Sequence, residues 1–331
     1  MMVYRAALIG CGKIGSEFAD DPRVQGIYSH AGAYAACPGT KLVAVCDTDP
    51  IRLGQCGDRW GVAARYQDAK LLLAEQHPDV VSICTHDHSH YDLVRAAIST
   101  GARAVLAEKP LAQTLEHANE LVRLAKERGV VLVVNYSRRY ADNHVKLRSL
   151  IKAGSIGPVG TVSGYYTKGL LHNGTHWFDL ARFLVGEVAW VWGFATGKDE
   201  SDDSPLDAFL QFDCGASAHL MACDTKAFSI FEMDLIGTRG RARVIESGHT
   251  IEIYQVVDSP YYTGYRTLAL YDHIEGGMQD ALLHAVEDMI RCLETGDQPT
   301  CSVADGAAAL KIAIAVRESA RSGQRIAMYD R

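Results

Sequence analysis

The sequence lacks the cysteine spacing of a disulfide or zinc framework. Its nine cysteines are scattered along 331 residues, odd in number, and no two of them form a C-x-x-C pair. Disulfide frameworks and structural zinc sites need paired spacing, so we expect reduced thiols that are mostly buried as small hydrophobic side chains. Reduced thiols favour a cytoplasmic protein.

Basic charge and long apolar runs are scarce as well. The net charge of −7 leaves no basic excess to neutralise phosphates, which argues against a nucleic-acid partner. The nearest approach to a membrane span, FLVGEVAWVWGFATG, is too short and carries Glu187. No basic segment followed by an apolar stretch and a cleavage site stands near Met1. We therefore expect no membrane partner and no secretory signal.

What is present is enough chain for two domains, since 331 residues exceed one ordinary core. Over residues 1–135, short apolar strand segments alternate with amphipathic helical segments, which predicts a doubly wound parallel α/β sheet. Over residues 136–331, period-two alternation and glycine-containing turns predict an α+β domain on a large, mostly antiparallel open sheet. Two helices, at about 276–294 and 303–322, follow that sheet, and we expect them to reach back to the first domain.

The most informative stretch is VYRAALIGCGKIG, in which a β-branched run ends in Gly10, Gly12 and Gly15. The G-x-G-x-x-G spacing suits a dinucleotide: Gly10 permits the tight turn, Gly12 leaves room for the pyrophosphate, and Gly15 allows close helix packing. We expect a helix over KIGSEFA whose N-terminus faces the phosphates. The alternative is a plain flexible turn, which the preceding strand makes the weaker interpretation.

An acidic residue, Asp47, ends the next apolar run, KLVAVC. In a dinucleotide-binding half such a residue accepts hydrogen bonds from the adenosine ribose and repels a 2′-phosphate, so NAD is expected and NADP is the alternative. The other interpretation is a helix cap, and Asp49 before Pro50 fits that role. The distance from Gly15 to Asp47 exceeds the usual spacing of about 20 residues. We attribute the surplus to an insertion over residues 20–29.

Lys109 stands just past a predicted parallel strand, at the edge where open α/β sheets bind ligands. Pro110 keeps it out of a helix. A lysine in this position can donate to a substrate hydroxyl or to a developing alkoxide. The alternative is a surface lysine paired with Glu108.

Histidines form two further clusters. If residues 173–184 are helical, His172, His176 and Asp179 share one face and could serve acid–base chemistry, metal ligation or ordinary half-buried hydrogen bonding. The zinc-protease motif requires a Glu where Asn173 stands. His86, His88 and His90 alternate where a strand gives way to a helix, so their alternation is not expected to persist. We expect no metal at either cluster.

These motifs resemble the glucose–fructose oxidoreductase / inositol dehydrogenase / MocA family of NAD(P)-dependent oxidoreductases. The resemblance is carried by ALIGCGKIG, VAVCDTDP, ICTHDHSHYDLVRAAISTGARAVLAEKPLA, the G-x-H-x-x-D of Gly174, His176 and Asp179, and GGMQDALLHAVEDMIRCLETGDQP. It covers nearly the whole chain, and the E-K-P motif is its most specific part. It implies a Rossmann domain and then a substrate-binding domain whose open sheet makes homodimers or homotetramers.

The resemblance also implies hydride transfer between NAD(P) and a secondary alcohol or ketone of a sugar, nucleotide sugar or cyclitol. Lys109 would polarise the hydroxyl, His176 would act as acid–base, Asp179 would orient the site, and His172 would contact substrate. The cofactor site is then expected at Gly10, Gly12, Lys13, Ile14, Gly15, Asp47, Thr85, His86, His90, Glu108 and Lys109. The substrate site is expected at Lys109, Arg138, Tyr165, His172 and His176.

The sequence departs from the family pattern at two places. His172 stands where cyclitol and sugar dehydrogenases usually have an aspartate, and Thr85-His86-Asp87 stands where Thr-Pro-Asn often lies beside the nicotinamide ribose. Either change fits a different substrate subgroup. The alternatives are a redox-neutral NAD-dependent glycosidase or lyase of the same fold, and a non-catalytic NAD(P)-binding sensor. The presence of both Lys109 and His176 argues against the sensor.

Overall fold

The computed structural model describes residues 2–195, 203–223 and 227–329. The chain forms two compact units, Met1–Ala141 with Gln279–Ala308, and Asp142–Met278 with Ala309–Arg331. This division differs from the boundary expected at residue 135, because the segment that follows the last Rossmann strand is tied to the C-terminal part of the first unit. The Tyr140 hydroxyl accepts a hydrogen bond from the Cys301 N–H at 3.0 Å, and Nδ1 of His284 lies 3.0 Å from the Tyr140 carbonyl oxygen.

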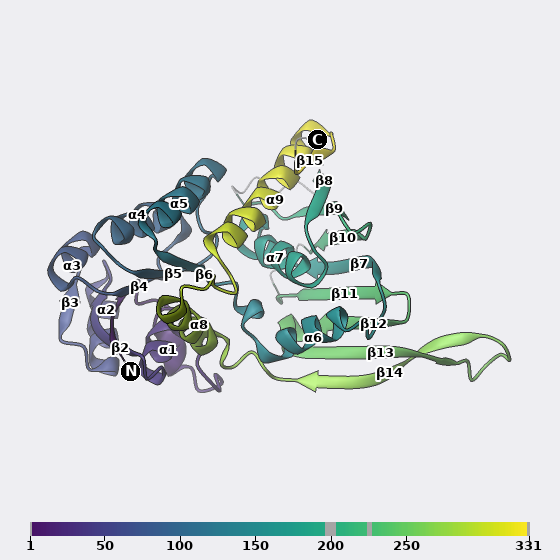
Figure 1. The fold of residues 1–331 in the computed structure, drawn as a ribbon, viewed down its shortest axis with the longest axis horizontal. Helices are drawn as coiled ribbons and strands as arrows, with labels where there is room; N and C mark the ends of the chain where they lie inside the picture. The colour runs from purple at the N-terminus through teal and green to yellow at the C-terminus, as the bar shows by residue number, and fades with distance from the viewer. Residues whose placement is uncertain (1, 196–202, 224–226, 330–331) are drawn as a thin grey trace. The chain divides into compact units, whose positions relative to one another are not determined.

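The first unit is built on a six-stranded parallel sheet in the order β3-β2-β1-β4-β5-β6, which confirms the predicted doubly wound architecture (Figure 1). Strands β4 and β5 are buried along their whole length, which explains their continuous apolar sequence. The strand order reverses between β1 and β4, and ligands of such sheets bind at that switch point. The strands are β1 (Tyr4–Ile9), β2 (Thr40–Cys46), β3 (Ala64–Tyr66), β4 (Val80–Ile83), β5 (Ala104–Ala107) and β6 (Val131–Val134).

Helices cover both faces of this sheet. Helix α1 packs on α8 at one face, while α4 packs between α3 and α5 at the other (Figure 1). The helices are α1 (His30–Ala36), α2 (Pro50–Trp60), α3 (Ala69–Gln76), α4 (His90–Ser99), α5 (Leu115–Arg128) and α8 (Ala281–Thr295). Helix α5 has the bounds that its sequence predicts, since the Thr114 hydroxyl caps its start and Gly129, with φ of +63°, ends it.

The second unit is built on a nine-stranded sheet in the order β14-β13-β12-β11-β7-β10-β9-β8-β15. Its pairings are antiparallel except that of β7 with β10, so the prediction of a mostly antiparallel open sheet is confirmed. The strands are β7 (Val159–Tyr166), β8 (Val188–Ala195), β9 (Leu206–Phe212), β10 (Ser217–Ala222), β11 (Phe231–Gly237), β12 (Gly240–Ile245), β13 (Thr250–Asp258), β14 (Arg266–Glu275) and β15 (Ile326–Ala327).

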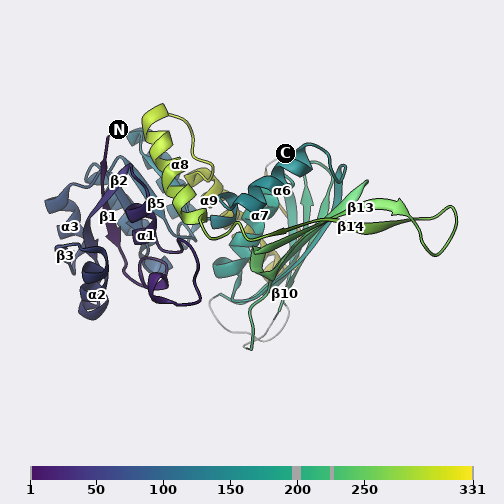
Figure 2. The same ribbon diagram turned by 90° about the horizontal axis from the view of Figure 1, so that it is seen from below.

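Helices α6 (Asp142–Lys152) and α7 (Thr175–Leu184), with the later part of α9 (Val303–Ser322), cover one face of the nine-stranded sheet (Figure 2). Burial alternates strictly along β9, from Leu206 to Phe212, as expected for strands with one face in a core. Beyond the helices, β13 and β14 continue as a two-stranded ribbon whose turn exposes Tyr261, Tyr262 and Tyr265.

Two elements of the first unit, β3 and α3, were not predicted from the sequence. Strand β3 has only three residues, with Arg65 at its centre, so it lacks the apolar run that reveals a strand. Helix α3 has three consecutive leucines instead of a helical apolar spacing. In the parts of the chain that the structure describes, the helices are all too short or too polar to cross a bilayer.

Candidate functional site

In the glycine loop after β1, two of the glycines are crowded by neighbouring backbone and one is open. Gly10 has a φ of +98°, and a Cβ there would lie 2.6 Å from the Cys84 carbonyl carbon. A Cβ on Gly15 would lie 2.0 Å from the Gly10 carbonyl oxygen. At Gly12, by contrast, nothing in the described chain lies within 4 Å of where a Cβ would be. The loop therefore fits the close approach of dinucleotide phosphates at Gly12, while the other two glycines are required by the fold.

The helix that we expected directly after the glycines does not form there, so this prediction is wrong. Residues 12–16 form a turn, and a 3-10 helix covers Glu17–Asp20. Helix α1 begins only at His30, whose N–H donates to the Ile14 carbonyl oxygen at 3.0 Å. Residues 21–29, which the sequence analysis takes as an insertion, are not helical and precede α1. Phosphates would therefore meet one turn of backbone, not the end of a long helix.

Lys13 and Ile14 lie on this turn and have different surroundings. Lys13 is exposed, so its ammonium can reach an anion at the loop. Ile14 is half-buried and packs against an apolar cluster that includes Leu8, Cys11 and Leu53. Ile14 therefore anchors the turn to the core beneath it.

Asp47 follows β2 directly, and its carboxylate holds the glycine loop. Its Oδ2 accepts a hydrogen bond from the Cys11 N–H at 2.7 Å, and its Oδ1 accepts one from the Asp49 N–H at 2.9 Å. Each oxygen has a second lone pair with which to accept a ribose hydroxyl. Asp49 caps α2 by accepting from the N–H groups of Ile51 and Arg52, so its predicted capping role is confirmed.

Glu108 and Lys109 follow β5 at the carboxyl edge of the parallel sheet. Glu108 is buried, and its Oε1 lies 2.6 Å from Nδ2 of Asn135 and 3.1 Å from Nε2 of His30. Its Oε2 accepts from the Lys109 N–H at 3.3 Å. The other side-chain atom of Asn135, Oδ1, is buried and has no hydrogen-bond partner among the described residues.

The Glu108 carboxyl is ionised at neutral pH although it is buried. Burial opposes ionisation, but the hydrogen bond from His30, the charge of Lys109 and the hydrogen bond from the Asn135 amide outweigh it, and the pKa of Glu108 is lowered. A buried anion therefore lies next to the half-buried Lys109 at the ligand-binding edge.

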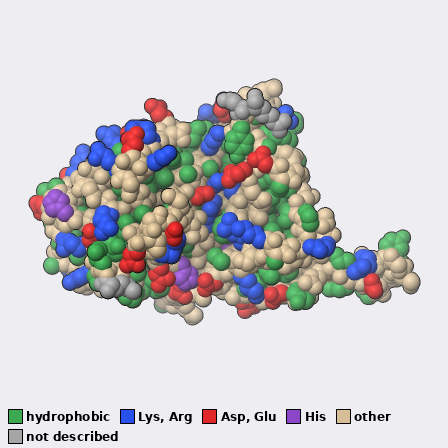
Figure 3. Space-filling view, viewed as in Figure 1, with side chains coloured by type: hydrophobic (Ala, Val, Ile, Leu, Met, Phe, Trp, Pro, Cys, Tyr) green, Lys and Arg blue, Asp and Glu red, His purple; other side chains and the backbone are tan. Residues whose placement is uncertain are grey.

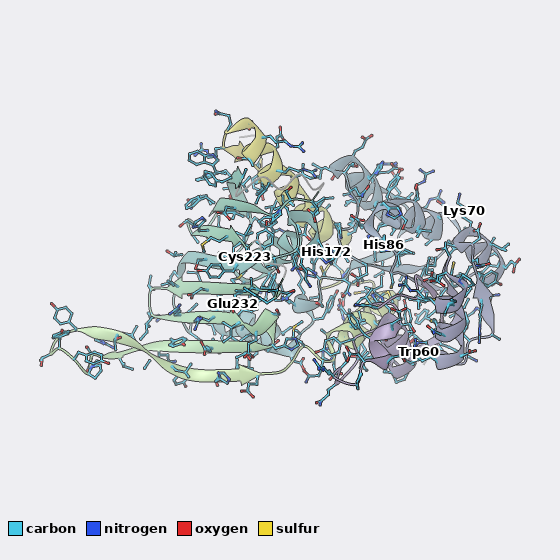
Figure 4. All side chains as sticks on the ribbon, turned by 180° about the vertical axis from the view of Figure 1, so that it is seen from behind. Trp60, Lys70, His86, His172, Cys223 and Glu232 are labelled. Atoms are coloured by element: carbon cyan, nitrogen blue, oxygen red, sulfur yellow. The ribbon has the colours of Figure 1, made fainter. Side chains whose placement is uncertain are left out.

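Thr85, His86 and His90 occupy the loop between β4 and α4. His90 is buried, and its ring nitrogens lie 2.7 Å from the Pro110 carbonyl oxygen and 2.9 Å from that of Thr85. It thereby ties the end of β4 to the segment after β5. The Thr85 hydroxyl accepts from the Ser89 hydroxyl at 2.7 Å. His86 is exposed at this edge (Figure 4).

The described residues contain no group of three or more metal-ligating side chains. His86 and His88 stack with ring centroids 6.1 Å apart, whereas His90 turns into the core. A 3-10 helix over Asp87–Ser89 breaks the alternation, as the sequence analysis expected.

In the second unit, the helix expected over 173–184 is divided. Leu170–Gly174 form a π-helical turn, and α7 begins at Thr175. His172 therefore lies on the π-helical turn, whereas His176 and Asp179 lie on α7. His172 is exposed, His176 is half-buried with its ring edge-on to Phe231 at 6.5 Å, and Asp179 is buried.

Asp203 holds this π-helical turn in place. Its two carboxylate oxygens accept from the backbone N–H groups of Leu171 at 2.6 Å and His172 at 2.9 Å. A Cβ on Gly169, just before the turn, would lie 2.2 Å from the Asp203 carboxylate. The backbone that carries His172 is therefore fixed by a carboxylate from a distant segment.

Trp177 fixes α7, and with it His176, on the sheet. Its Nε1 donates to the carbonyl oxygen of Glu232 on β11 at 3.1 Å. A Cβ on Gly164 would lie 2.2 Å from that Nε1, so the glycine permits this close packing.

The residues expected to bind substrate differ in their surroundings. Burial lowers the pKa of Arg138 to about 10. Tyr165 is exposed on β7. Arg139 and Tyr140, which follow Arg138 in the chain, are buried within the first unit, where Arg139 pairs with Asp305 at 3.1 Å.

His30, Asn135 and Asp203 are the polar residues that sequence reasoning missed. His30 meets Glu108 across 78 positions of sequence, and Asp203 meets the 171–172 backbone across about 30. No local pattern marks such pairs. Asn135 alone had a signal, since it directly follows a predicted strand at the same edge as Lys109.

Comparison with known proteins gives consistent matches for both units. Residues 4–136 match the model GFO_IDH_MocA, described as an oxidoreductase family with an NAD-binding Rossmann fold. Residues 166–243 match the model of the GFO/IDH/MocA C-terminal domain.

Several curated relatives and solved structures match this sequence over nearly its whole length. The D-apiose dehydrogenase of Rhizobium rhizogenes is 26% identical over 98% of each chain. The myo-inositol 2-dehydrogenase of Thermotoga maritima is 25% identical over 98% of this chain and 99% of its own. A levoglucosan dehydrogenase, solved with NADH and levoglucosan, has the same fold, with a TM-score of 0.84 at 20% identity over 99% of this chain and 100% of that one.

Proposed function

The chain belongs to the GFO/IDH/MocA family of oxidoreductases, and we propose that it transfers a hydride between NAD and its substrate. The proposed substrate is a secondary alcohol or ketone of a sugar, nucleotide sugar or cyclitol. The observation that carries the proposal is the carboxyl edge of the parallel sheet, where the open Gly12 loop, Asp47 and Glu108-Lys109 lie on one unit. When bound at this edge, NAD would supply the hydride acceptor or donor, while the protein binds and orients cofactor and substrate and moves one proton.

In this proposal Lys109 polarises the reacting hydroxyl. Its ammonium lowers the cost of alkoxide character at the oxygen while the carbinol C–H bond breaks. The charge of Lys109 in turn favours the ionised form of the buried Glu108 beside it.

His176 takes the hydroxyl proton during oxidation and returns it during reduction. Imidazole suits this role because it titrates near neutral pH. The half-buried ring is held on α7, which Trp177 docks onto the sheet. The buried Asp179, one turn further along the helix, orients the region around His176.

Asp47 favours NAD over NADP. Its carboxylate is fixed by two backbone N–H groups, so it cannot move aside for a 2′-phosphate without losing them. Lys13, Ile14, Thr85, His86 and His90 complete the proposed cofactor site, with His90 acting by holding the two loops together.

The substrate is proposed to be a small polyol, since relatives are named for apiose and inositol. Arg138, Tyr165 and His172 are the proposed hydroxyl-binding residues besides Lys109 and His176. His172, held on the π-helical turn, offers an imidazole in place of the family's usual aspartate, which fits a substrate subgroup of its own.

We also propose a homodimer or homotetramer formed through the sheet face opposite α6 and α7. That face carries stacked Trp190 and Phe209, and Trp192 and Phe194 are about 40% exposed. Figure 3 shows the other side of the molecule, the side seen in Figure 1, where Lys and Arg side chains lie close to Asp and Glu side chains. Light scattering on the purified chain tests the assembly, and a monomer at micromolar concentration would contradict it.

The function is tested by incubating the purified chain with NAD and a panel of sugars, nucleotide sugars and inositols while recording nicotinamide absorbance. The proposal expects NADH to form with at least one polyol, and turnover to be lost in both Lys109→Ala and His176→Ala. Full activity of both variants would refute the site assignment. Cofactor that stays bound without net reduction while a glycoside is cleaved would favour the redox-neutral alternative, and binding without any turnover would favour the sensor.

A further inference from the structure

A chain of four polar side chains crosses the core of the first unit beneath Lys109. The Tyr34 hydroxyl lies 2.7 Å from Oγ of Ser82, and that Oγ lies 2.8 Å from Nδ1 of His30. Nε2 of His30 lies 3.1 Å from Oε1 of Glu108. Tyr34, Ser82 and His30 are at most 1% exposed. Three elements contribute, namely α1, β4 and the end of β5.

Only one arrangement of the hydrogen atoms gives every donor among these four side chains an acceptor. Tyr34 donates to Ser82, Ser82 donates to Nδ1, and Nε2–H donates to the Glu108 carboxylate. If Nδ1 carried the hydrogen instead, Ser82 would donate back to Tyr34. The Tyr34 proton would then be left buried, because the described chain offers that hydroxyl no second partner. The hydroxyls therefore direct the N–H of His30 at Glu108.

Glu108 needs this donor. An ionised carboxylate is costly to bury unless it is paired and hydrogen-bonded. Its Oε1 has two donors, His30 and Asn135, and its Oε2 receives the Lys109 N–H. An apolar residue at position 108 would avoid the cost, so the buried anion is more consistent with a requirement of the ligand-binding edge than with one of the fold.

We propose that His30 is a positioning residue which keeps Glu108 ionised and oriented under the backbone of Lys109. This inference rests on the proposed function, and it adds α1 to the site through a residue that touches neither cofactor nor substrate. Loss of the His30 donor frees the carboxyl to rotate or take up a proton. The Lys109 N–H then loses its fixed acceptor, and the proposed site loses one negative charge.

Two substitutions separate this role from simple packing. His30→Gln can place an amide N–H near the position of Nε2 and keep the bond to Glu108. His30→Asn reaches only the position of Nδ1, so it keeps the Ser82 contact and loses Glu108. The matched control is the same pair of exchanges at His273, whose Nε2 lies 3.0 Å from Glu275 in an exposed pair.

The readouts are kcat, KM, and the Kd values of NAD+ and NADH from nicotinamide and protein fluorescence, with thermal unfolding recorded for every variant. A hydrogen bond to a buried charge predicts that His30→Asn lowers kcat about tenfold or more, while His30→Gln stays within about threefold of the parent. NAD+ carries a cationic ring and NADH a neutral one, so His30→Asn is also expected to weaken NAD+ more than NADH. The His273 variants should change neither quantity.

The outcomes separate this inference from the proposed function. Equal losses in both His30 variants that follow their unfolding temperatures would overturn the positioning role, as would an unchanged ratio of NAD+ to NADH affinity in His30→Asn. If the parent turns over no polyol, the proposed function fails, and the affinity ratio alone then supports or overturns the role of His30.

Discussion

Replacement of each loop glycine by alanine tests the candidate cofactor site most finely, because the structure gives the three positions different surroundings. A Cβ at Gly15 would sit 2.0 Å from the Gly10 carbonyl oxygen, and one at Gly10 would sit 2.6 Å from backbone atoms after β4. A Cβ at Gly12 would meet nothing within 4 Å in the described chain. The same chemical change is therefore expected to have opposite consequences for stability and for binding.

Gly12→Ala should leave the fold unchanged and damage the cofactor site. With no steric contact and no positive φ at Gly12, the free energy of unfolding should stay within about 0.5 kcal/mol of the parent. The added methyl group occupies the space that suits the pyrophosphate, and overpacking of this kind costs roughly 1–3 kcal/mol. The Kd of NADH should therefore rise about tenfold or more.

Gly15→Ala and Gly10→Ala should act mainly on the fold. Their Cβ atoms would overlap with backbone, which cannot rotate away as a side chain can, so each should lower the free energy of unfolding by at least roughly 1–3 kcal/mol. Gly10 adds the strain of its left-handed φ.

The assays are urea unfolding followed by circular dichroism, and NADH titration by fluorescence under conditions where each variant is folded. Gly54→Ala is the control, since this glycine lies inside α2 with nothing within 4 Å of its Cβ position. It should stabilise the chain by about 0.5–1 kcal/mol and leave NADH affinity unchanged. A Gly12→Ala variant that binds NADH as tightly as the parent, or unfolds as easily as Gly15→Ala, would refute the assignment of the loop.

Four further outcomes are expected. Asp47→Asn removes a fixed charge and should reduce the preference for NAD over NADP by about tenfold, and equal Kd values for the two cofactors in the parent would contradict this role. Lys109→Ala and His176→Ala should each lower kcat by about 10²–10⁴ while the Kd of NADH stays within about threefold, so a variant that loses NADH binding instead would count against a catalytic role. In Asp203→Asn, one carboxylate oxygen that accepts from a backbone N–H is replaced by an amide NH2 group, which cannot accept. The variant should therefore have a higher KM and a free energy of unfolding that is lower by about 1–2 kcal/mol. An unchanged KM would show that the π-helical turn does not bind substrate. Because the pKa of Glu108 is lowered on folding, its ionisation stabilises the native state above the ordinary glutamate pKa, and this gain is lost as the pH falls through the folded value. Glu108→Gln should therefore flatten the loss of urea resistance as the pH falls below about 4.3, and an identical slope in that range would contradict the lowered pKa.

The fold was largely predictable because its strands and helix ends have local signals. The parallel strands β4 and β5 are buried along their whole length and stand out as apolar runs, and Gly129 marks the end of α5 in sequence as in structure. The elements that were missed are those without such a signal, such as the three-residue β3.

The site was predictable where chemistry and strand ends coincide. The steric reason for each loop glycine agrees with the expectation from spacing, and Asp49 caps α2 as predicted. The helix expected directly after Gly15 is absent from that place: a turn, a 3-10 helix over Glu17–Asp20 and the non-helical residues 21–29 follow Gly15, and α1 begins at His30. The π-helical turn at Leu170–Gly174 depends on Asp203, which no local pattern connects to it.

The central claim is hydride transfer between a polyol carbon and NAD, and isotope transfer tests it most directly. A polyol that supports turnover is prepared with deuterium on the oxidised carbon, and the NADH formed is analysed by mass spectrometry. The account predicts one deuterium atom per NADH formed, with none incorporated when unlabelled polyol is used in deuterated water. NADH without the label, or release of the deuterium to solvent without NADH, would contradict it.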